Sequence, residues 1–559
     1  MGMPPRLFTR GVPAFAASLA LILGGCAAAT PLSQPAKHFS GVSTCARAIT
    51  TDSEEAQAWF DQGLTLLYGF NHDEATRSFH AATVADPDCT MAWWGLAIAS
   101  GIDLNDGRMS REDCRRAYDA AQQAVATSAG KPDLEVGLAN AIATRFSWPP
   151  PGDRRPLDEA YAAAMEEVYD SHSDDVDVAT LYADSLMALN PWHYWTPENE
   201  FFGRSEEAVE VLEAALKTDP DHAGATHYLI HILEVGDPAR AEAAADQLAD
   251  AVPGAGHLLH MPSHIYVHIG RYDSGVDANV DAIAADEIYL ADIEDPGNYL
   301  GYYAHNVHML AYCAMMEGRE EMAMDAARQL ERDVTDDHIA DDPAWLDGLM
   351  ATPLHVMVRF GRWEDLLDEP EPASFRYFSR AQWHYARGVA MSALGLTDRA
   401  RRELADFKRV ARMVPESWNA GSNPSSEVLD IAGHMFEAEL LWREGDTEGA
   451  FEHMREGVAV EDAMRYGEPP GWMQPVRHAY GALLMADGQA ELAESVYLTD
   501  LEKNPGNGWS LLGLQLALAE QGKMTESREA GRELAQVWDR ADINPGSSCF
   551  CEPGEVVDA

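Results

Sequence analysis

Residues 56–87 read AQAWFDQGLTLLYGFNHDEATRSFHAATVADP. Apolar and small residues recur at helical spacing in two runs, separated by a turn at residues 70–72 and ended by Asp86-Pro87. The residues that define the runs are Trp59, Gly63 and Leu66, then Ala75, Phe79 and Ala82. Small residues at such positions let two helices pack closely, so the stretch predicts a helical hairpin.

The same placing of Trp, Gly, Ala, Phe and Pro is typical of the 34-residue tetratricopeptide repeat. A second unit begins at residues 91–96, and regular repeats resume at Arg204. Turn signals that each precede another apolar helix follow at Gly270, Gly318, Gly361, Gly395, Gly445, Gly488 and Gly522. The sequence shows no strand-forming alternation of useful length and no Gly-rich phosphate loop. It therefore predicts an all-α fold, a tetratricopeptide-repeat-type α-solenoid in which helical hairpins form a right-handed superhelix.

Composition and periodicity divide the chain into five segments. These are a signal peptide (1–25), a tether beginning at Cys26 (26–55), less regular helical repeats (56–203), more regular repeats (204–545) and a tail (546–559). The tether is rich in Ala, Thr, Ser and Pro. Pro-rich connections at residues 148–151 and 190–197 interrupt the less regular repeats. The second carries three aromatic residues and is predicted to be an ordered loop.

The N-terminus has two arginines, Arg6 and Arg10, and then an apolar run from Gly11 to Leu23 that is too short to cross a bilayer. The run ends in Leu-Gly-Gly-Cys, which resembles the lipobox of bacterial lipoproteins and implies cleavage before Cys26 and lipidation of its thiol. Ala27, in place of Asp, suggests an outer-membrane anchor facing the periplasm. The expected location is the cell envelope; a soluble secreted protein with an incidental cysteine is the alternative.

Ninety-two acidic residues against forty basic ones give a formal net charge of −52. Such a field repels nucleic acid and attracts cations, so we expect no nucleic-acid partner. A surface adapted to salty surroundings explains the charge without a single partner. Near the C-terminus, Cys549-Phe550-Cys551 could bind a metal or form a redox pair.

Histidines concentrate between Thr226 and His308, in three helix-like segments. Within each segment they are three or four residues apart and share one helix face. Counted back from the turns at Asp237, Gly270 and Gly318, they fall at the same positions in successive helices. Stacked repeats would therefore gather the imidazoles on one surface. The histidines concerned are His227, His231, His257, His260, His264, His305 and His308.

Neighbouring first helices should lie about 8–10 Å apart, so imidazoles from two or three of them can meet one ion. Neutral imidazole binds zinc, copper or iron, and Glu234 would be a further ligand or the general base. Pro262 is expected to mark the start of its helix, which would place His257 and His260 in the preceding turn. Histidines packed singly between helices, a relic of repeat duplication and a metal-free polar groove are the alternatives.

Five further residues are candidates for lining a ligand groove: Tyr266, Arg271, Trp192, Trp195 and His355. Arg271 could hold a substrate carboxylate, although a structural ion pair would explain it as well. The two tryptophans could form a stacking platform or simply the core between repeats.

Longer motifs extend over most of the mature chain. They are YGFNHDEA (68–75), MAWWGLA (91–97), RFSWPPP (145–151), NPWHYWTP (190–197), THYLIH (226–231) and GAGHLLHMPSHIY (254–266). On these motifs the chain resembles bacterial tetratricopeptide-repeat proteins, many of them secreted or lipid-anchored. The resemblance implies a concave groove lined by the first helices, with positions such as His257, His260 and His264 facing a ligand. It implies no particular activity.

We therefore expect an envelope-anchored repeat protein that binds a protein, a peptide or a small ligand in a His-lined concave groove. The alternative is a metal-dependent enzyme, a hydrolase or an oxidase, with the histidines as ligands and Glu234 as base. No Ser-His-Asp or Cys-His nucleophile is identifiable by motif.

Overall fold

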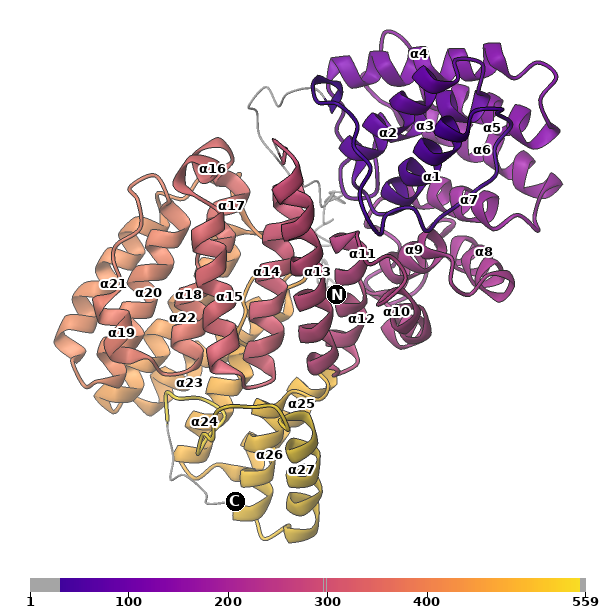
Figure 1. Ribbon diagram of the computed structural model, residues 1–559. Coiled ribbons are helices and arrows are strands. Elements are labelled where there is room, and N and C mark those ends of the chain that lie inside the picture. Colours follow the sequence, from indigo (N-terminus) through magenta and orange to yellow (C-terminus); the bar gives the residue numbers. More distant parts are fainter. Residues whose placement is uncertain (1–30, 295, 298, 553–559) are drawn as a thin grey trace, which may run out of the picture.

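Helical hairpins make up almost all of the structure (Figure 1). The computed structural model describes residues 31–294, 296–297 and 299–552, so the predicted signal peptide and Cys26 lie outside the described residues. Within this part of the chain the strands are two residues long, β1 (Asn419–Ala420) and β2 (Asn423–Pro424), and they pair with each other. The predicted all-α repeat fold is confirmed.

Each helix packs mainly against its neighbours in sequence. The N-terminal helices are α1 (Glu54–Tyr68), α2 (His72–Ala85), α3 (Thr90–Ala99), α4 (Arg111–Thr127), α5 (Asp133–Arg145), α6 (Arg155–Ser171) and α7 (Val176–Met187), after the short η1 (Pro31–Ser33). The middle helices are α8 (Ser205–Thr218), α9 (Ala223–Leu233), η2 (Pro238–Ala241), α10 (Glu242–Leu248), α11 (Gly256–His260), α12 (Pro262–His268), α13 (Tyr272–Asp292), α14 (Tyr299–Met316), α15 (Glu320–Asp333), α16 (Asp336–Asp341), α17 (Pro343–Leu349), α18 (Thr352–Arg359) and α19 (Trp363–Asp368). The C-terminal helices are α20 (Tyr377–Ala393), α21 (Thr397–Ala411), α22 (Ser425–Glu444), α23 (Thr447–Asp462), α24 (Val476–Ala486), α25 (Ala490–Lys503), α26 (Gly508–Glu520) and α27 (Met524–Val537).

Small residues set the spacing inside the first repeat, as the sequence predicts. The ring of Phe79, on α2, lies between Gly63 on α1 and Gly95 on α3. A Cβ atom added to Gly95 would lie 2.2 Å from the Phe79 ring, and one added to Gly63 would lie 2.8 Å from it. Three helices therefore meet around one aromatic side chain.

The turns between hairpin arms lie at the glycines that the sequence predicts. Gly445, for example, ends α22 in the left-handed conformation (φ 86°), and its N–H donates to two carbonyls of the last turn. All seven predicted turn glycines have positive φ: Gly270, Gly318, Gly361, Gly395, Gly445, Gly488 and Gly522. The loop at 190–197 is ordered too, because its Tyr194 side chain is buried.

The hairpins form a curved row, with the N-terminal helices on one side and α19–α21 on the other, and α24–α27 lie beneath the middle helices (Figure 1), where Trp509 of α26 donates to the Met315 carbonyl of α14. The row curves enough to bring distant segments together. α1 contacts α9, and the loop of residues 463–475 between α23 and α24 reaches back to α12 and α14 through Glu468 and Met473. These long-range contacts meet at the histidine cluster described below.

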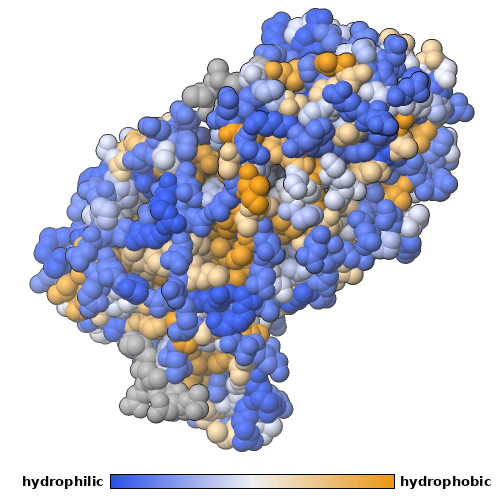
Figure 2. Space-filling model, in the orientation of Figure 1, coloured by the Kyte–Doolittle hydropathy of each residue, from blue (hydrophilic) through white to orange (hydrophobic). Residues whose placement is uncertain are grey.

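Hydrophilic residues cover most of the face shown in Figure 2, as a net charge of −52 requires. None of the helices in the described part of the chain combines the length and the apolar character needed to span a bilayer.

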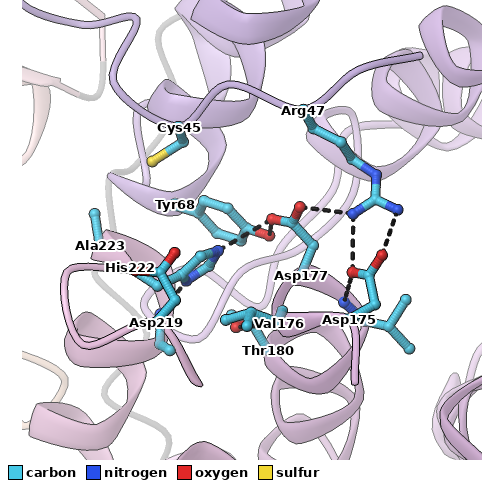
Figure 3. A network of polar contacts seen from close by, with 12 residues as sticks. Cys45, Arg47, Tyr68, Asp175, Val176, Asp177, Thr180, Asp219, His222 and Ala223 are labelled. Carbon is cyan, nitrogen blue, oxygen red and sulfur yellow. Dashed lines mark hydrogen bonds and ion pairs between the residues drawn. The ribbon is translucent and has the colours of Figure 1, made fainter. Parts of the chain in front are cut away.

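The segment before α1 is packed against the solenoid. His38 stacks on Trp59 with ring centroids 3.6 Å apart. Arg47 forms ion pairs with Asp175 and Asp177 at 2.8 and 2.7 Å (Figure 3). Part of the predicted tether is thus held against the solenoid by aromatic stacking and two ion pairs.

Asp177 is the centre of this network. Besides Arg47, the Tyr68 hydroxyl and His222 Nε2 donate hydrogen bonds to Asp177 Oδ1 at 2.7 and 3.1 Å (Figure 3). Burial alone would raise the pKa of the Asp177 carboxyl, but the hydrogen bond from His222 and the charge of Arg47 outweigh it and lower the pKa below the ordinary value.

Replacing Asp177 by Asn is expected to lower the free energy of unfolding by about 1–3 kcal/mol at pH 7. The folded-state pKa is depressed, so the native carboxylate stabilises the protein above the unfolded pKa of about 4 and loses this effect as the pH falls below it. Urea unfolding at pH 7 and pH 3 measures the free energy of unfolding of the wild type and of Asp177→Asn. The difference between the two proteins should be smaller at pH 3. Asp221→Asn, an exposed carboxylate on the rim of the same pocket, is the control. An Asp177→Asn effect of equal size at both pH values would contradict this account.

The predicted tail is also packed over its described part. Ser548 is buried; its hydroxyl donates to the His478 carbonyl at 2.8 Å, and Arg359 donates to the Ser548 carbonyl at 2.9 Å. Cys549 and Cys551 form a disulfide, one of the two expectations for this motif. The described part of the tail is therefore bound to α18 and α24.

Candidate metal centre

Six histidines from four helices lie together in the structure. His227 and His231 are on α9, His257 and His260 on α11, His264 on α12 and His305 on α14. Pro262 begins α12, as expected, but His257 and His260 lie in the short helix α11 and not in a turn. Met261, between α11 and α12, keeps a right-handed helical conformation. His260 and His264 therefore remain one turn apart on one face, with their Nε2 atoms 2.8 Å from each other.

The first triad consists of His227, His231 and His257, whose ligand nitrogens lie within 4.8 Å of one another. All three side chains are buried, at most 3% exposed. Nε2 of each has no hydrogen-bond partner among the described residues, and Nδ1 of His257 has none either. Phe70 stacks on His231 and His257, with ring centroids 5.6 Å away in both cases. Buried nitrogens without partners are costly unless something binds them.

The second triad consists of His260, His264 and His305, again with ligand nitrogens within 4.8 Å of one another. His260 and His264 are buried, whereas His305 is half-buried at the edge of the cluster. The two triads adjoin, since the rings of His231 and His264 have centroids 6.2 Å apart and those of His257 and His260 6.1 Å apart. The arrangement can hold one metal ion in each triad.

Glu234 lies between the triads and is fully buried. Its Oε1 accepts from His231 Nδ1 at 3.3 Å, and its Oε2 accepts from His264 Nδ1 at 2.6 Å. Both oxygens are thus engaged with imidazoles, while Glu234, His264 and Glu468 also offer ligand atoms within 4.8 Å of one another, so its predicted role as a ligand or base stays a prediction. Glu234 orients a histidine of each triad, the usual role of a carboxylate behind metal-binding imidazoles.

Two more histidines have the same support. His227 Nδ1 donates to the Tyr68 carbonyl and His260 Nδ1 to Asn279 Oδ1, each at 2.6 Å. With the two bonds to Glu234, four of the six rings donate from Nδ1. This fixes their tautomer and directs Nε2 into the cluster.

Glu468, from the loop before α24, is a second buried carboxylate at the cluster that sequence reasoning missed. Its Oε2 lies 2.9 Å from His264 Nδ1, and its Oε1 contacts His268. The loop shows no periodicity that could have revealed it. Asn279 was also missed, although it follows His260 by 19 residues, the spacing of His384 and Glu403 in a later hairpin.

Burial lowers the pKa of His227, His257 and His260 well below the ordinary value and that of His305 to about 3, so these rings are neutral and suited to bind metal. His264 differs. Burial opposes its charge, but the carboxylates of Glu234 and Glu468 outweigh burial and raise its pKa to about 10. For Glu468 itself, burial is outweighed by His268 and His264, and its pKa falls to about 2.

His308 and His355 belong to neither triad. His308 Nε2 lies 3.3 Å from the Met473 sulfur, and His355 packs edge-on against Trp472 with ring centroids 5.2 Å apart. The expectation that His308 joins the metal ligands is not supported, since its Nε2 faces a thioether.

The predicted groove residues take different places. Trp192 packs edge-on against His231 and forms part of the wall of the cluster, whereas Trp195 donates to the Ile232 carbonyl at 2.7 Å. Arg271 lies over the Tyr266 ring, 4.3 Å from its centroid, and pairs with carboxylates of α10. Arg271 thus has a structural ion pair, and the histidine cluster is enclosed rather than spread along an open groove.

No protein-family model matches the chain, and no curated protein matches it significantly. Among solved structures it is similar to the human IFIT1 dimer with m7Gppp-AAAA at 13% identity, covering 88% of this chain and 91% of that one, with a TM-score of 0.31. A monomeric mutant of IFIT1 with Gppp-AAAA gives 12% identity, coverage of 88% and 92%, and a TM-score of 0.30. The fold and the site define the class: an all-α helical-repeat protein with buried histidine clusters that can hold metal.

Proposed function

We propose that this repeat protein binds two transition-metal ions, one in each histidine triad. One observation carries the proposal: His227, His231 and His257 are buried, each offers a ligand nitrogen within 4.8 Å of the others, and Nε2 of each has no hydrogen-bond partner among the described residues. A structural histidine in a protein core normally has both nitrogens satisfied. Unprotonated imidazole nitrogens that lie close together and have no hydrogen-bond donor are what a metal requires.

The donor set narrows the choice of metal. Six imidazoles, two of them hydrogen-bonded to the Glu234 carboxylate, favour zinc or copper over magnesium and calcium, which prefer oxygen ligands. Non-haem iron usually takes two histidines and one carboxylate as direct ligands, and Glu234 is already bonded to His231 and His264. We therefore propose zinc or copper.

Metal analysis of protein purified without an affinity tag tests this proposal. We expect about two equivalents of tightly bound zinc or copper per chain. The double variant His227→Ala/His231→Ala should lose one equivalent, and His260→Ala/His264→Ala should lose the other. A wild-type protein that retains no metal after gel filtration, and takes up none when zinc or copper is added, would contradict the proposal.

A metal-dependent enzyme is the second candidate function. Three protein ligands per ion leave at least one coordination position for water or substrate, as in catalytic rather than structural sites. His305 is half-buried and gives the second triad an edge toward solvent. Copper in the triads would favour oxidation and zinc hydrolysis, with a small molecule, a peptide or a protein side chain as substrate. The net charge of −52 argues against nucleic acid.

We also propose that Cys26 carries a lipid that holds the protein at the outer membrane, facing the periplasm. The lipobox-like sequence before Cys26 supports this, and the Cys549–Cys551 disulfide fits an oxidising compartment. In cell fractionation, the wild-type protein should remain with the membranes and Cys26→Ser should not. Equal distribution of the two proteins would contradict the anchor.

A further inference from the structure

A third group of potential ligands lies far along the chain from the triads, on the hairpin of α22 and α23. His434 comes from α22, and His453 and Glu456 come from α23. His434 Nδ1 and His453 Nδ1 are 3.0 Å apart. Glu456 Oε2 lies 3.3 Å from the first nitrogen and 3.7 Å from the second. Three donor atoms thus form a small triangle.

The size of this triangle fits a bound ion. A tetrahedral zinc ion with bonds of about 2.0–2.1 Å holds its ligand atoms about 3.3 Å apart. The three observed separations of 3.0, 3.3 and 3.7 Å lie close to that value. The same atoms make a poor hydrogen-bonded group, because only one proton fits between two imidazole nitrogens and the carboxylate must share it.

Other hairpins show which residue pairs with a histidine Nδ1 at this spacing. His260 and Asn279 are 19 residues apart and hydrogen-bonded, and so are His384 and Glu403. In both pairs a ring nitrogen meets an oxygen that accepts its proton. In the α22–α23 hairpin the partner, 19 residues on, is a second imidazole instead. Where the other two hairpins have an oxygen acceptor, the α22–α23 hairpin therefore has His453, whose ring nitrogen can bind a metal ion.

The triangle is open to solvent. The side chains of His434 and His453 are each 25% exposed and that of Glu456 is 52% exposed. Glu437 adds negative charge nearby, with Oε2 3.9 Å from His453 Nε2, while its Oε1 pairs with Lys408. A cation held here would keep a fourth position for water and would exchange with the surrounding solution.

We propose that His434, His453 and Glu456 form a mononuclear site for a divalent transition-metal ion such as zinc. Two imidazoles and one carboxylate suit zinc, nickel and copper(II) and do not suit calcium or magnesium. The site is separate from the two triads and does not depend on their metal content.

Titration of zinc into full-length protein, first treated with a chelator, tests the inference. His453→Asn introduces the residue that follows His260 at the same spacing, so it keeps a hydrogen bond to His434 and removes a metal donor. We expect isothermal titration calorimetry to show one equivalent less for this variant than for the wild type. A Co²⁺ titration should show the same loss in the visible absorption of tetrahedral cobalt.

His384→Asn is the matched control, because its hairpin carries one histidine and should bind no ion; it should retain the wild-type stoichiometry. Identical zinc isotherms and cobalt spectra for His453→Asn and the wild type would overturn the inference. Failure of the two-triad proposal would give a different result. The wild type would then bind about two equivalents fewer than expected, while His453→Asn would still bind one equivalent less than the wild type. Circular dichroism of each variant checks that it is folded.

Discussion

Replacing His257 by phenylalanine is expected to make the metal-free protein more stable and, at the same time, to remove one bound metal ion. Both ring nitrogens of His257 are buried without partners among the described residues, and its neighbours include the rings of Phe70 and Tyr302. An apolar ring at this position avoids the cost of two unsatisfied nitrogens. We expect a gain of about 1–3 kcal/mol in the free energy of unfolding, after allowance for the slightly larger ring.

Urea unfolding in the presence of a chelator measures this gain, and metal analysis of the same protein measures the loss. In saturating zinc or copper the wild type should be more stable than His257→Phe. Only the wild type has a complete first triad, and a metal ion bound there stabilises the folded state. His355→Phe is the control: His355 is also buried with Nδ1 unpaired, but it lies against Trp472, outside both triads. It should leave the metal content unchanged. A His257→Phe protein that is less stable without metal would point to a structural histidine instead.

Glu234→Gln is expected to weaken metal binding in both triads at once, by about 10–100-fold in each. The carboxylate accepts a hydrogen bond from His231 with one oxygen and from His264 with the other. A carboxamide has one acceptor oxygen, so one of the two rings must lose its support or turn. Competition with a chromogenic chelator measures the two affinities separately.

Asn279→Leu provides the comparison. Asn279 accepts from His260 Nδ1 alone, so this variant should weaken the second triad and leave the first unchanged. If Glu234→Gln affected only one triad, or neither, the role of Glu234 as the common support of both would be wrong.

The hairpin architecture was predictable because its causes are local. The spacing of Gly63 and Phe79, and the glycines at turns such as Gly445, act within one or two helices and can be recognised without knowledge of the rest of the chain. The histidine spacing likewise predicted that His227 and His231, or His260 and His264, share a helix face. Such a pattern does not show how far the superhelix closes, so the sequence predicted a His-lined concave groove but not that its histidines would be buried.

The supporting residues could not be found in this way. Asn279 had a weak signal in its distance from His260, but Glu468 lies in an irregular loop and the Tyr68 group involved is a backbone carbonyl, which no side-chain pattern reports. The full set of contacts of Glu234 could not be predicted for the same reason. Its sequence position next to His231 suggested a base, and only the approach of His264 shows that its second oxygen is also engaged.

The sequence by itself determined the helices, their pairing into hairpins and the presence of histidines at equivalent positions. Only the tertiary structure decided which histidines meet, which carboxylates stand behind them and where the N- and C-terminal segments bind. The physical reason lies in the range of the interactions. A hairpin is fixed by contacts within some thirty residues, whereas the contact between Tyr68 and His227 spans 159 residues and depends on the small rotations of every repeat between them.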